Sequence, residues 1–196
     1  MNVLELSKKT VPCQRNWLDD YNIPQKDIDY IIKTCTTMPT KQEKNTYSLC
    51  AITDRRYIEK LYRFCYDPDD EISFNKNTQV LANLLLVWYD GPDAKHDDGS
   101  NNNVNVGVSA GGAALAAVEL GYKTGFCKCF VSEKISTVLK PHIGLTRKKK
   151  LRRIRLLLGI GVPEANLESN VRRMEGGYLG STTKFGYTKN IKVTKI

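Results

Sequence analysis

Apolar residues recur every three or four positions in three segments of the chain: 24–37, RRYIEKLYRFC at 55–65 and EKISTVLK at 133–140. This spacing predicts three amphipathic helices, each with one face toward a core. A fourth segment, VGVSAGGAALAAVELG at 106–121, is rich in Gly and Ala and predicts a helix that ends at Gly121. Its small side chains would let another backbone approach closely, which suits a central or interface helix.

Apolar runs between these helices predict the strands of a core. They are YSLCAI at 47–52, VLANLLLVWYD at 80–90, TGFCKCF at 124–130 and LRRIRLLLGIGVP at 151–163. The run at 80–90 is nearly continuous, which is typical of a strand buried on both faces, and it is too short to span a bilayer. Because strands and helices alternate without a repeat, we predict one mixed α/β domain over residues 1–196.

Two other segments bear on organisation and cellular location. GPDAKHDDGSNNN at 91–103 is the most loop-like part of the chain, and we predict a mobile loop rather than a domain linker. The first ten residues, MNVLELSKKT, contain neither an apolar signal core nor a cleavage site. We therefore expect a cytoplasmic protein that makes no contact with a membrane.

Cysteines and histidines give little support for a metal site. The six cysteines are scattered, except for Cys127 and Cys129, and the chain has two histidines. A single C-x-C pair without a second pair or a histidine cluster is poor evidence for zinc. We expect free thiols and no metal.

The net charge of +9 comes largely from TRKKKLRRIR at 146–155 and from a lysine-rich tail at 184–195. Such basic runs are typical either of a solvated surface or of a surface that binds nucleic acid. Aromatic residues are not interleaved with the first run, which weakens the case for single-strand binding. We therefore expect no nucleic-acid partner, while keeping a basic nucleic-acid-binding protein as the alternative function.

Familiar catalytic motifs are missing from the sequence. It contains no G-x-S-x-G, P-loop, H-E-x-x-H or G-x-G-x-x-G after a strand, so a bound cofactor is the expected source of any reactivity. The stretch 11–47 combines a fixed positive charge and small polar side chains on either side of a helix. Such groups near helix termini suit an anionic, hydrogen-bonding ligand.

The order of these segments also resembles the nitroreductase family. VPCQRNW at 11–17 is similar to the family's basic opening motif, with Arg15 on its second basic position, and PTKQEKNTY at 39–47 is similar to its Pro-Ser-Ser loop. SFNKNTQVLANLLLV at 73–87 resembles the family's Phe-Asn segment, and ALAAVELGYKTGFCKCF resembles its central helix, turn and flavin-facing strand. Lys184 and KNIKVT at 189–194 resemble a phosphate-binding residue followed by a C-terminal arm over 184–196. The resemblance covers nearly the whole chain.

This resemblance implies a three-layer α/β (α+β) sandwich with a mostly antiparallel central sheet, in an intertwined homodimer. It also implies that VPCQRNW and MPTKQEKNTY form two walls of the flavin pocket, contributed by different subunits. It implies an FMN-dependent oxidoreductase that takes hydride from NADH or NADPH through flavin N5 to a nitroaromatic, quinone or related small-molecule electron acceptor. The flavin carries the chemistry, so no catalytic side chain is assigned. The cofactor-binding residues that it implies are Cys13, Arg15, Pro39, Thr40, Lys41, Glu43, Asn75, Cys127, Lys128, Cys129 and Lys184.

Several assignments keep alternatives. Val11 and Gly186 stand where the family has arginines, which predicts weaker retention of the FMN phosphate. Arg15 could instead form a surface ion pair, and Asn75 could cap a turn. Cys127 and Cys129 could be core thiols. The same fold could also perform reductive dehalogenation or flavin degradation.

Overall fold

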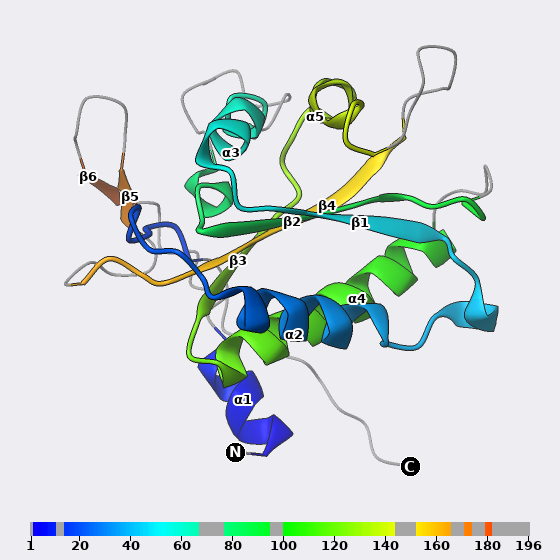
Figure 1. The fold of residues 1–196 in the computed structure, drawn as a ribbon, viewed down its shortest axis with the longest axis horizontal. Coiled ribbons are helices and arrows are strands. Elements are labelled where there is room, and N and C mark those ends of the chain that lie inside the picture. The colour runs from blue at the N-terminus through cyan, green and yellow to red at the C-terminus, as the bar shows by residue number, and fades with distance from the viewer. Residues whose placement is uncertain are drawn as a thin grey trace.

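The computed structural model describes residues 2–10, 14–66, 77–94, 100–143, 152–165, 171–173 and 179–181. In these ranges a four-stranded sheet lies between two layers of helices (Figure 1). No helix in them is long and apolar enough to span a membrane.

The central sheet is antiparallel throughout. Its strands are β1 (Tyr47–Ile52), β2 (Leu84–Asp90), β3 (Lys123–Cys127) and β4 (Ile154–Gly161), in the order β1-β2-β4-β3. A separate two-stranded sheet pairs β5 (Val171–Arg173) with β6 (Leu179–Ser181). The predicted mixed α/β class and antiparallel sheet are confirmed.

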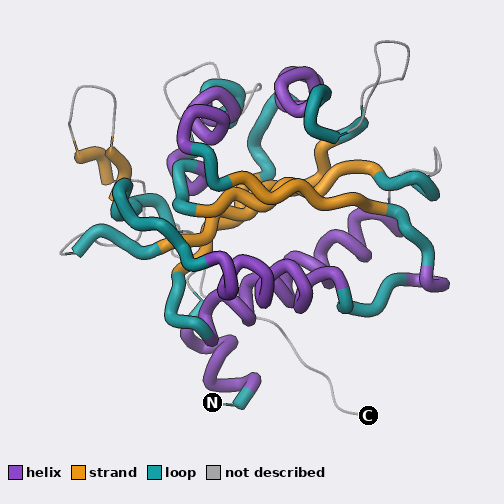
Figure 2. The backbone as a smooth tube through the Cα atoms, in the orientation of Figure 1, coloured by secondary structure: helices purple, strands orange, loops and turns teal. Residues whose placement is uncertain are grey.

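Helices cover both faces of the central sheet, as the tube in Figure 2 shows. One face carries α2 (Gln25–Thr36) and α4 (Ser100–Glu119); the other carries α3 (Arg55–Tyr62), α5 (Ser132–Leu139) and the short 3-10 helix η2 (Thr78–Val80). The N-terminal helix α1 (Val3–Lys9) lies against α4, and the 3-10 helix η1 (Lys41–Glu43) precedes β1. These layers form the expected three-layer sandwich.

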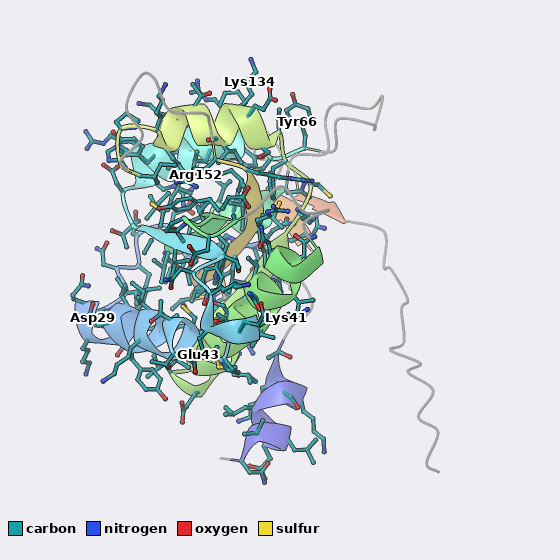
Figure 3. The ribbon with its side chains drawn as sticks, turned by 90° about the vertical axis from the view of Figure 1, so that its right-hand side faces the viewer. Asp29, Lys41, Glu43, Tyr66, Lys134 and Arg152 are labelled. Carbon is teal, nitrogen blue, oxygen red and sulfur yellow. The ribbon has the colours of Figure 1, made fainter. Side chains whose placement is uncertain are left out.

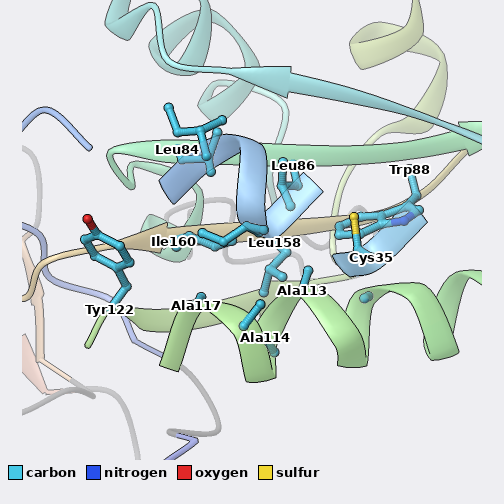
Figure 4. Close-up of a cluster of buried hydrophobic side chains, with 14 of the residues drawn as sticks. Cys35, Leu84, Leu86, Trp88, Ala113, Ala114, Ala117, Tyr122, Leu158 and Ile160 are labelled. Atoms are coloured by element: carbon cyan, nitrogen blue, oxygen red, sulfur yellow. The ribbon is translucent and has the colours of Figure 1, made fainter. Parts of the chain in front are cut away.

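Alternate residues of β2 divide the core between the two faces. Leu84, Leu86 and Trp88 pack with the alanines of α4 (Figure 4), whereas Leu85 and Val87 pack toward α3 and α5. Successive side chains of a strand point to opposite faces, so a continuous apolar run fits a strand covered on both sides. The Gly- and Ala-rich composition of α4 thus places this helix close to the sheet.

The helix α4 ends as its sequence predicts. Gly121 has φ of +92°, and the N–H groups of Gly121 and Tyr122 donate to the carbonyl oxygens of Val118 and Ala117. This pair of bonds is the Schellman arrangement, which needs a left-handed residue that glycine provides without strain.

Several predicted boundaries were wrong. The helix α4 begins at Ser100, so residues 100–103 of the predicted 91–103 loop are helical; residues 95–99 lie outside the described ranges. Hydrogen bonds to distant segments hold this early turn, because Arg155 donates to Asn103 Oδ1, and Asn105 accepts from Lys41 N and donates to Thr46 Oγ1. β2 begins at Leu84 rather than at residue 80, because residues 78–80 form η2. β3 ends at Cys127, before the expected end at residue 130.

A buried hydrogen-bond chain joins β2, α4 and α2, and it gives the first prediction. Trp88 Nε1 donates to Ser109 Oγ at 2.9 Å, and Ser109 Oγ donates to the carbonyl oxygen of Cys35 at 2.9 Å. Ser109→Ala would leave Trp88 Nε1 buried and unpaired, and the carbonyl oxygen of Cys35 would keep only the longer bond from the Tyr47 hydroxyl at 3.4 Å. We therefore expect the free energy of unfolding to fall by about 1–3 kcal/mol in urea denaturation.

Ser136→Ala is the matched control. Ser136 on α5 is equally buried, and its hydroxyl has no hydrogen-bond partner among the described residues. We expect this substitution to leave stability unchanged or slightly raised. Equal losses in the two variants would contradict the assigned role of Ser109.

Candidate functional site

The segment that carries Arg15 is held along the edge of the sheet by backbone and amide bonds. Gln14 N donates to the carbonyl oxygen of Thr124 at 3.0 Å, and Leu18 N donates to that of Val162 at 2.9 Å. The side chain of Asn83 donates to the carbonyls of Leu18 and Tyr21 and accepts from Val162 N. These bonds fix the segment before α2 begins.

The 3-10 helix η2 lies directly on the sheet, next to this segment. Gly125 of β3 and Gly159 of β4 are paired across the strands. A Cβ on Gly125 would lie 2.7 Å from Gln79 Cβ and 2.5 Å from the carbonyl oxygen of Gln14, and a Cβ on Gly159 would overlap the carbonyl oxygen of Gln79. The two glycines therefore set how closely Gln14 and Gln79 approach β3.

Three buried polar atoms on these neighbouring segments have no hydrogen-bond partner among the described residues: Arg15 Nη1, Thr78 Oγ1 and Gln79 Oε1. The orientation of Gln79 is set by its Nε2, which donates to the carbonyl oxygen of Phe126 at 3.2 Å and to Asn77 Oδ1 at 3.4 Å. A buried polar atom without a partner costs about 1–3 kcal/mol. Three such atoms on adjoining segments are typical of a site that binds a polar ligand.

Other described polar atoms without a partner do not belong to this group. Asn102 Nδ2 is on α4 and Ser136 Oγ is on α5. Thr124 Oγ1 is on β3, and Thr124 precedes Gly125, so its side chain points to the opposite face of the sheet.

The predicted residues at the end of β3 and just after it differ in burial. The thiol of Cys127 lies in the core toward α3 and α5, whereas Lys128 and Cys129 are exposed. Contact of Cys127 with its neighbour Cys65, together with burial, raises the pKa of the Cys65 thiol well above its usual value. A ligand contact from Cys127 would therefore come from its backbone.

The ammonium group of Lys128 is held against the sheet. Its Nζ donates to the carbonyl oxygen of Arg155 at 2.7 Å and lies 5.3 Å from the ring centroid of Phe130. Partial burial, with repulsion from Arg153 and Arg155, lowers the pKa of Lys128. The guanidinium of Arg155 is itself 95% buried and pairs with Asp90 at 2.6 Å, at a bulge in the β2–β4 ladder. This pair fixes the carbonyl that Lys128 contacts.

A second group of predicted residues lies in the loop before β1. Lys41 N donates to Asn105 Oδ1 at 2.9 Å, and Asn105 Nδ2 donates to Thr46 Oγ1 at 2.8 Å, so α4 holds this loop. Lys41 and Glu43 are exposed, and Figure 3 shows both on the side of the sheet opposite Lys134. Glu43 has a left-handed φ of 53°.

A cavity of about 470 Å³ adjoins this loop. It is formed by the end of α2, by the 38–45 loop and by β1, and Thr40 is the predicted site residue on its wall. β1 is an edge strand, so the cavity borders the open edge of the sheet.

The two groups lie at opposite ends of the sheet (Figure 1). η2 and the Arg15 segment are beside the start of β2, whereas the 39–43 loop is beside its end, where Gly91 N donates to the carbonyl of Thr46. One chain therefore does not bring Arg15 together with Pro39, Thr40, Lys41 or Glu43.

Solved structures share this arrangement of helices and strands. The nitroreductase with bound FMN from Bacteroides fragilis aligns over 100% of both chains, with a TM-score of 0.67 and 15% identity. The nitroreductase family protein from Clostridium novyi covers 87% of this chain and 91% of its own, with a TM-score of 0.66 and 17% identity. An FMN-dependent nitroreductase from Clostridium difficile covers 85% of this chain and 91% of its own, with a TM-score of 0.63 and 16% identity.

The chain has the nitroreductase fold. No protein-family model and no curated protein sequence matches it. At identities of 15–17% the shared property is the fold, and the fold predicted from the order of the motifs is confirmed.

Within this nitroreductase fold, three predicted cofactor residues, Cys13, Asn75 and Lys184, lie outside the described ranges, as do Val11 and Gly186. Of the alternatives for Arg15, a surface ion pair finds no support, because its Nη1 is buried and unpaired among the described residues.

Sequence reasoning did not select Thr78 and Gln79. The sequence did contain one signal for them. Polar residues interrupt the segment NTQVLAN at 77–83, which leads directly into an apolar strand. Asn77, Thr78, Gln79 and Asn83 are all buried in the structure.

The described cysteine thiols differ in burial, and we therefore expect them to differ in reactivity. Under native conditions, iodoacetamide should label the exposed Cys129 well before Cys35, Cys65 or Cys127, because only a thiolate reacts and burial disfavours it. Burial raises the pKa of Cys35 to about 11. Peptide mapping by mass spectrometry measures each rate, and denatured protein is the control. Labelling of native Cys127 as fast as Cys129 would contradict its placement in the core.

Proposed function

We propose that this protein is an FMN-dependent oxidoreductase that uses NADH or NADPH as its electron donor. The observation that carries the proposal is the group of buried, unpaired polar atoms on Arg15, Thr78 and Gln79 beside β3. Support comes also from the fold, which is shared with an FMN-bound nitroreductase and with a candidate NAD(P)H:FMN oxidoreductase from Staphylococcus epidermidis.

The donor set on this side of the sheet fits a flavin. Arg15 offers a cationic donor, Gln79 an acceptor and Thr78 a hydroxyl, and the pyrimidine edge of a flavin carries both carbonyl oxygens and an N–H. The ammonium of Lys128, which donates to the carbonyl oxygen of Arg155, would add positive charge near the same strand end. Cys13, Asn75 and Lys184 remain further candidates for FMN contacts, and free thiols with a nicotinamide co-substrate favour the cytoplasm.

Bound FMN would supply two-electron hydride chemistry between a reduced nicotinamide and a small electrophile such as a nitroaromatic or a quinone. The chain's own part is to bind and orient. Arg15, whose Nη1 is buried, would hold positive charge against the ligand, and such an interaction is stronger there than in water. The backbone around Cys127 would form a wall of the site.

We infer that the complete site needs two copies of the chain. The segment before α2 and the 39–43 loop lie at opposite ends of one sheet, so a second subunit would supply the missing wall. α4 offers a surface for it: Val104 is 60% exposed, and a Cβ at Gly107 or Gly111 would have no atom within 4 Å. Small and apolar residues at this spacing let two helices approach closely.

The first test is the affinity for FMN, measured by quenching of its fluorescence. We expect the wild type to bind FMN, and Arg15→Met to bind about tenfold more weakly or worse, because a charged hydrogen bond contributes roughly 1.5–3 kcal/mol. Arg56→Met is the control, because Arg56 is exposed and pairs with Asp54 at 2.8 Å. A wild type that neither quenches nor retains FMN would contradict the proposed function.

The second test is the oligomeric state, measured by light scattering after size exclusion. We expect a dimer, and Val104→Glu should give monomers that bind FMN weakly, because the charge would face the second subunit. Lys60→Glu on α3, in the opposite helix layer, should remain dimeric. A Val104→Glu variant that stays dimeric with full FMN affinity would remove α4 from the interface.

A further inference from the structure

Three cysteines lie where the end of β3 meets the end of α3. Cys127 is the last residue of β3, Cys65 follows α3, and Cys129 is two residues beyond Cys127. None of the three is in a disulfide in the described structure. Their thiols have no part in the proposed flavin site, which uses only the backbone of Cys127.

Backbone and amide hydrogen bonds hold these two parts of the chain together. Val131 N donates to the carbonyl oxygen of Phe64 at 2.9 Å. Asn77 joins the same two segments, because its Nδ2 donates to the carbonyl oxygens of Cys65 at 3.3 Å and of Cys129 at 3.2 Å. Its backbone N also donates to the carbonyl oxygen of Cys65, at 2.8 Å. The segments that carry Cys65 and Cys129 are therefore fixed side by side.

The side chains of Cys65 and Cys127 are in direct contact. Both belong to the cluster between the sheet and the helices α3 and α5, and neither residue is more than 1% exposed. The thiol of Cys65 donates to the carbonyl oxygen of Leu61 at 3.2 Å, and that of Cys127 donates to the carbonyl oxygen of Cys129 at 3.4 Å. Two sulfur atoms in contact need only a small side-chain movement to reach a disulfide bond of about 2.05 Å.

Burial protects this pair from direct oxidation, whereas Cys129 is exposed. The contact with Cys127, together with burial, raises the pKa of the Cys65 thiol well above its usual value. Since the thiolate is the reactive form, Cys65 is a poor first target. An oxidant that arrives from solvent therefore reacts first with Cys129.

We propose that Cys129, Cys127 and Cys65 form a thiol relay in which hydrogen peroxide oxidises the buried Cys65–Cys127 pair to a disulfide. The Cys129 thiolate attacks peroxide, so that an S–O bond forms, the O–O bond breaks and hydroxide leaves as water after taking a proton. The Cys127 thiolate then attacks this sulfenic acid, which forms an S–S bond and releases a second water. Last, the Cys65 thiolate attacks the Cys127 sulfur, and Cys129 leaves as a thiolate. In sum, two thiols lose two electrons and two protons, and peroxide is reduced to two waters.

The relay ends at the Cys65–Cys127 bond for two reasons. A disulfide between Cys127 and Cys129 closes a very short ring, and strained or exposed disulfides are the more easily reduced ones. The reverse of the last step would need Cys65 to leave, and a thiol with a raised pKa is a poor leaving group. In a reducing compartment such a disulfide is a transient, redox-sensing one.

Peptide mapping of the peroxide-treated wild type tests the relay. Trypsin cuts after lysine and arginine, which places the three cysteines on the separate peptides 64–76, 124–128 and 129–134. After equimolar peroxide and blocking of the remaining thiols, we expect peptide 64–76 linked to 124–128 as the main product, released by dithiothreitol. The oxidised protein should also unfold at a temperature about 5 °C or more higher, because a disulfide across a long loop constrains the unfolded chain.

Three variants separate the steps. Cys129→Ser should slow formation of the Cys65–Cys127 disulfide at least about tenfold, because peroxide must then reach a buried thiol. Cys65→Ala should stop at the Cys127–Cys129 disulfide. Cys35→Ala is the matched control, since Cys35 is also fully buried but lies in the cluster beside α4, and it should oxidise as the wild type does. If Cys65→Ala does not fold, the wild type and Cys129→Ser still decide.

Other products would overturn the relay. A wild type that yields only the Cys127–Cys129 disulfide, only Cys129 linked between two molecules, or only Cys129 sulfinic acid would show that Cys65 is not the final partner. A Cys129→Ser variant that forms the Cys65–Cys127 disulfide at the wild-type rate would show that Cys129 is not the entry point.

Discussion

The close approach of η2 to the glycine pair Gly125 and Gly159 is the constraint on which the candidate site depends. Any larger residue at either position would collide with Gln79, and at Gly125 also with the backbone of Gln14. With both glycines present, two segments far apart in sequence lie on the same part of β3. Arg15 is carried by one of them and Thr78 and Gln79 by the other.

The buried polar groups near η2 are of two kinds: some have hydrogen-bond partners within the chain, and others have none among the described residues. Asn77, Asn83 and the Nε2 of Gln79 are all engaged with backbone or side-chain groups of the chain. Arg15 Nη1, Thr78 Oγ1 and Gln79 Oε1 are left without such partners in the described structure. Burying an unpaired polar group opposes folding, so these three atoms lower the free energy of unfolding. Such a loss of stability is common at functional sites.

Much of the fold was predictable from periodicity. The strand at 47–52 and the helices around 25–36, 55–62 and 132–139 follow patterns that depend on neighbours in sequence. The early start of α4 at Ser100 was not predictable, because its first turns are held by hydrogen bonds between Asn103 or Asn105 and distant segments. Composition alone made that stretch look like a loop.

The site was less predictable than the fold. Arg15 was found through motif resemblance, whereas the importance of Gln79 arises only when η2 meets the sheet. The family resemblance placed Arg15 and the 39–43 loop on pocket walls from different subunits, and one chain holds the two segments at opposite ends of β2. This separation follows from topology, which local sequence patterns do not encode.

A crystal structure of the protein grown with FMN tests the proposed site most directly. We expect the pyrimidine edge of FMN to lie against Arg15, Thr78 and Gln79 of one subunit, with the 39–43 loop of a second subunit completing the pocket. A complex that holds FMN elsewhere, or that leaves these three side chains without ligand contacts, would contradict it.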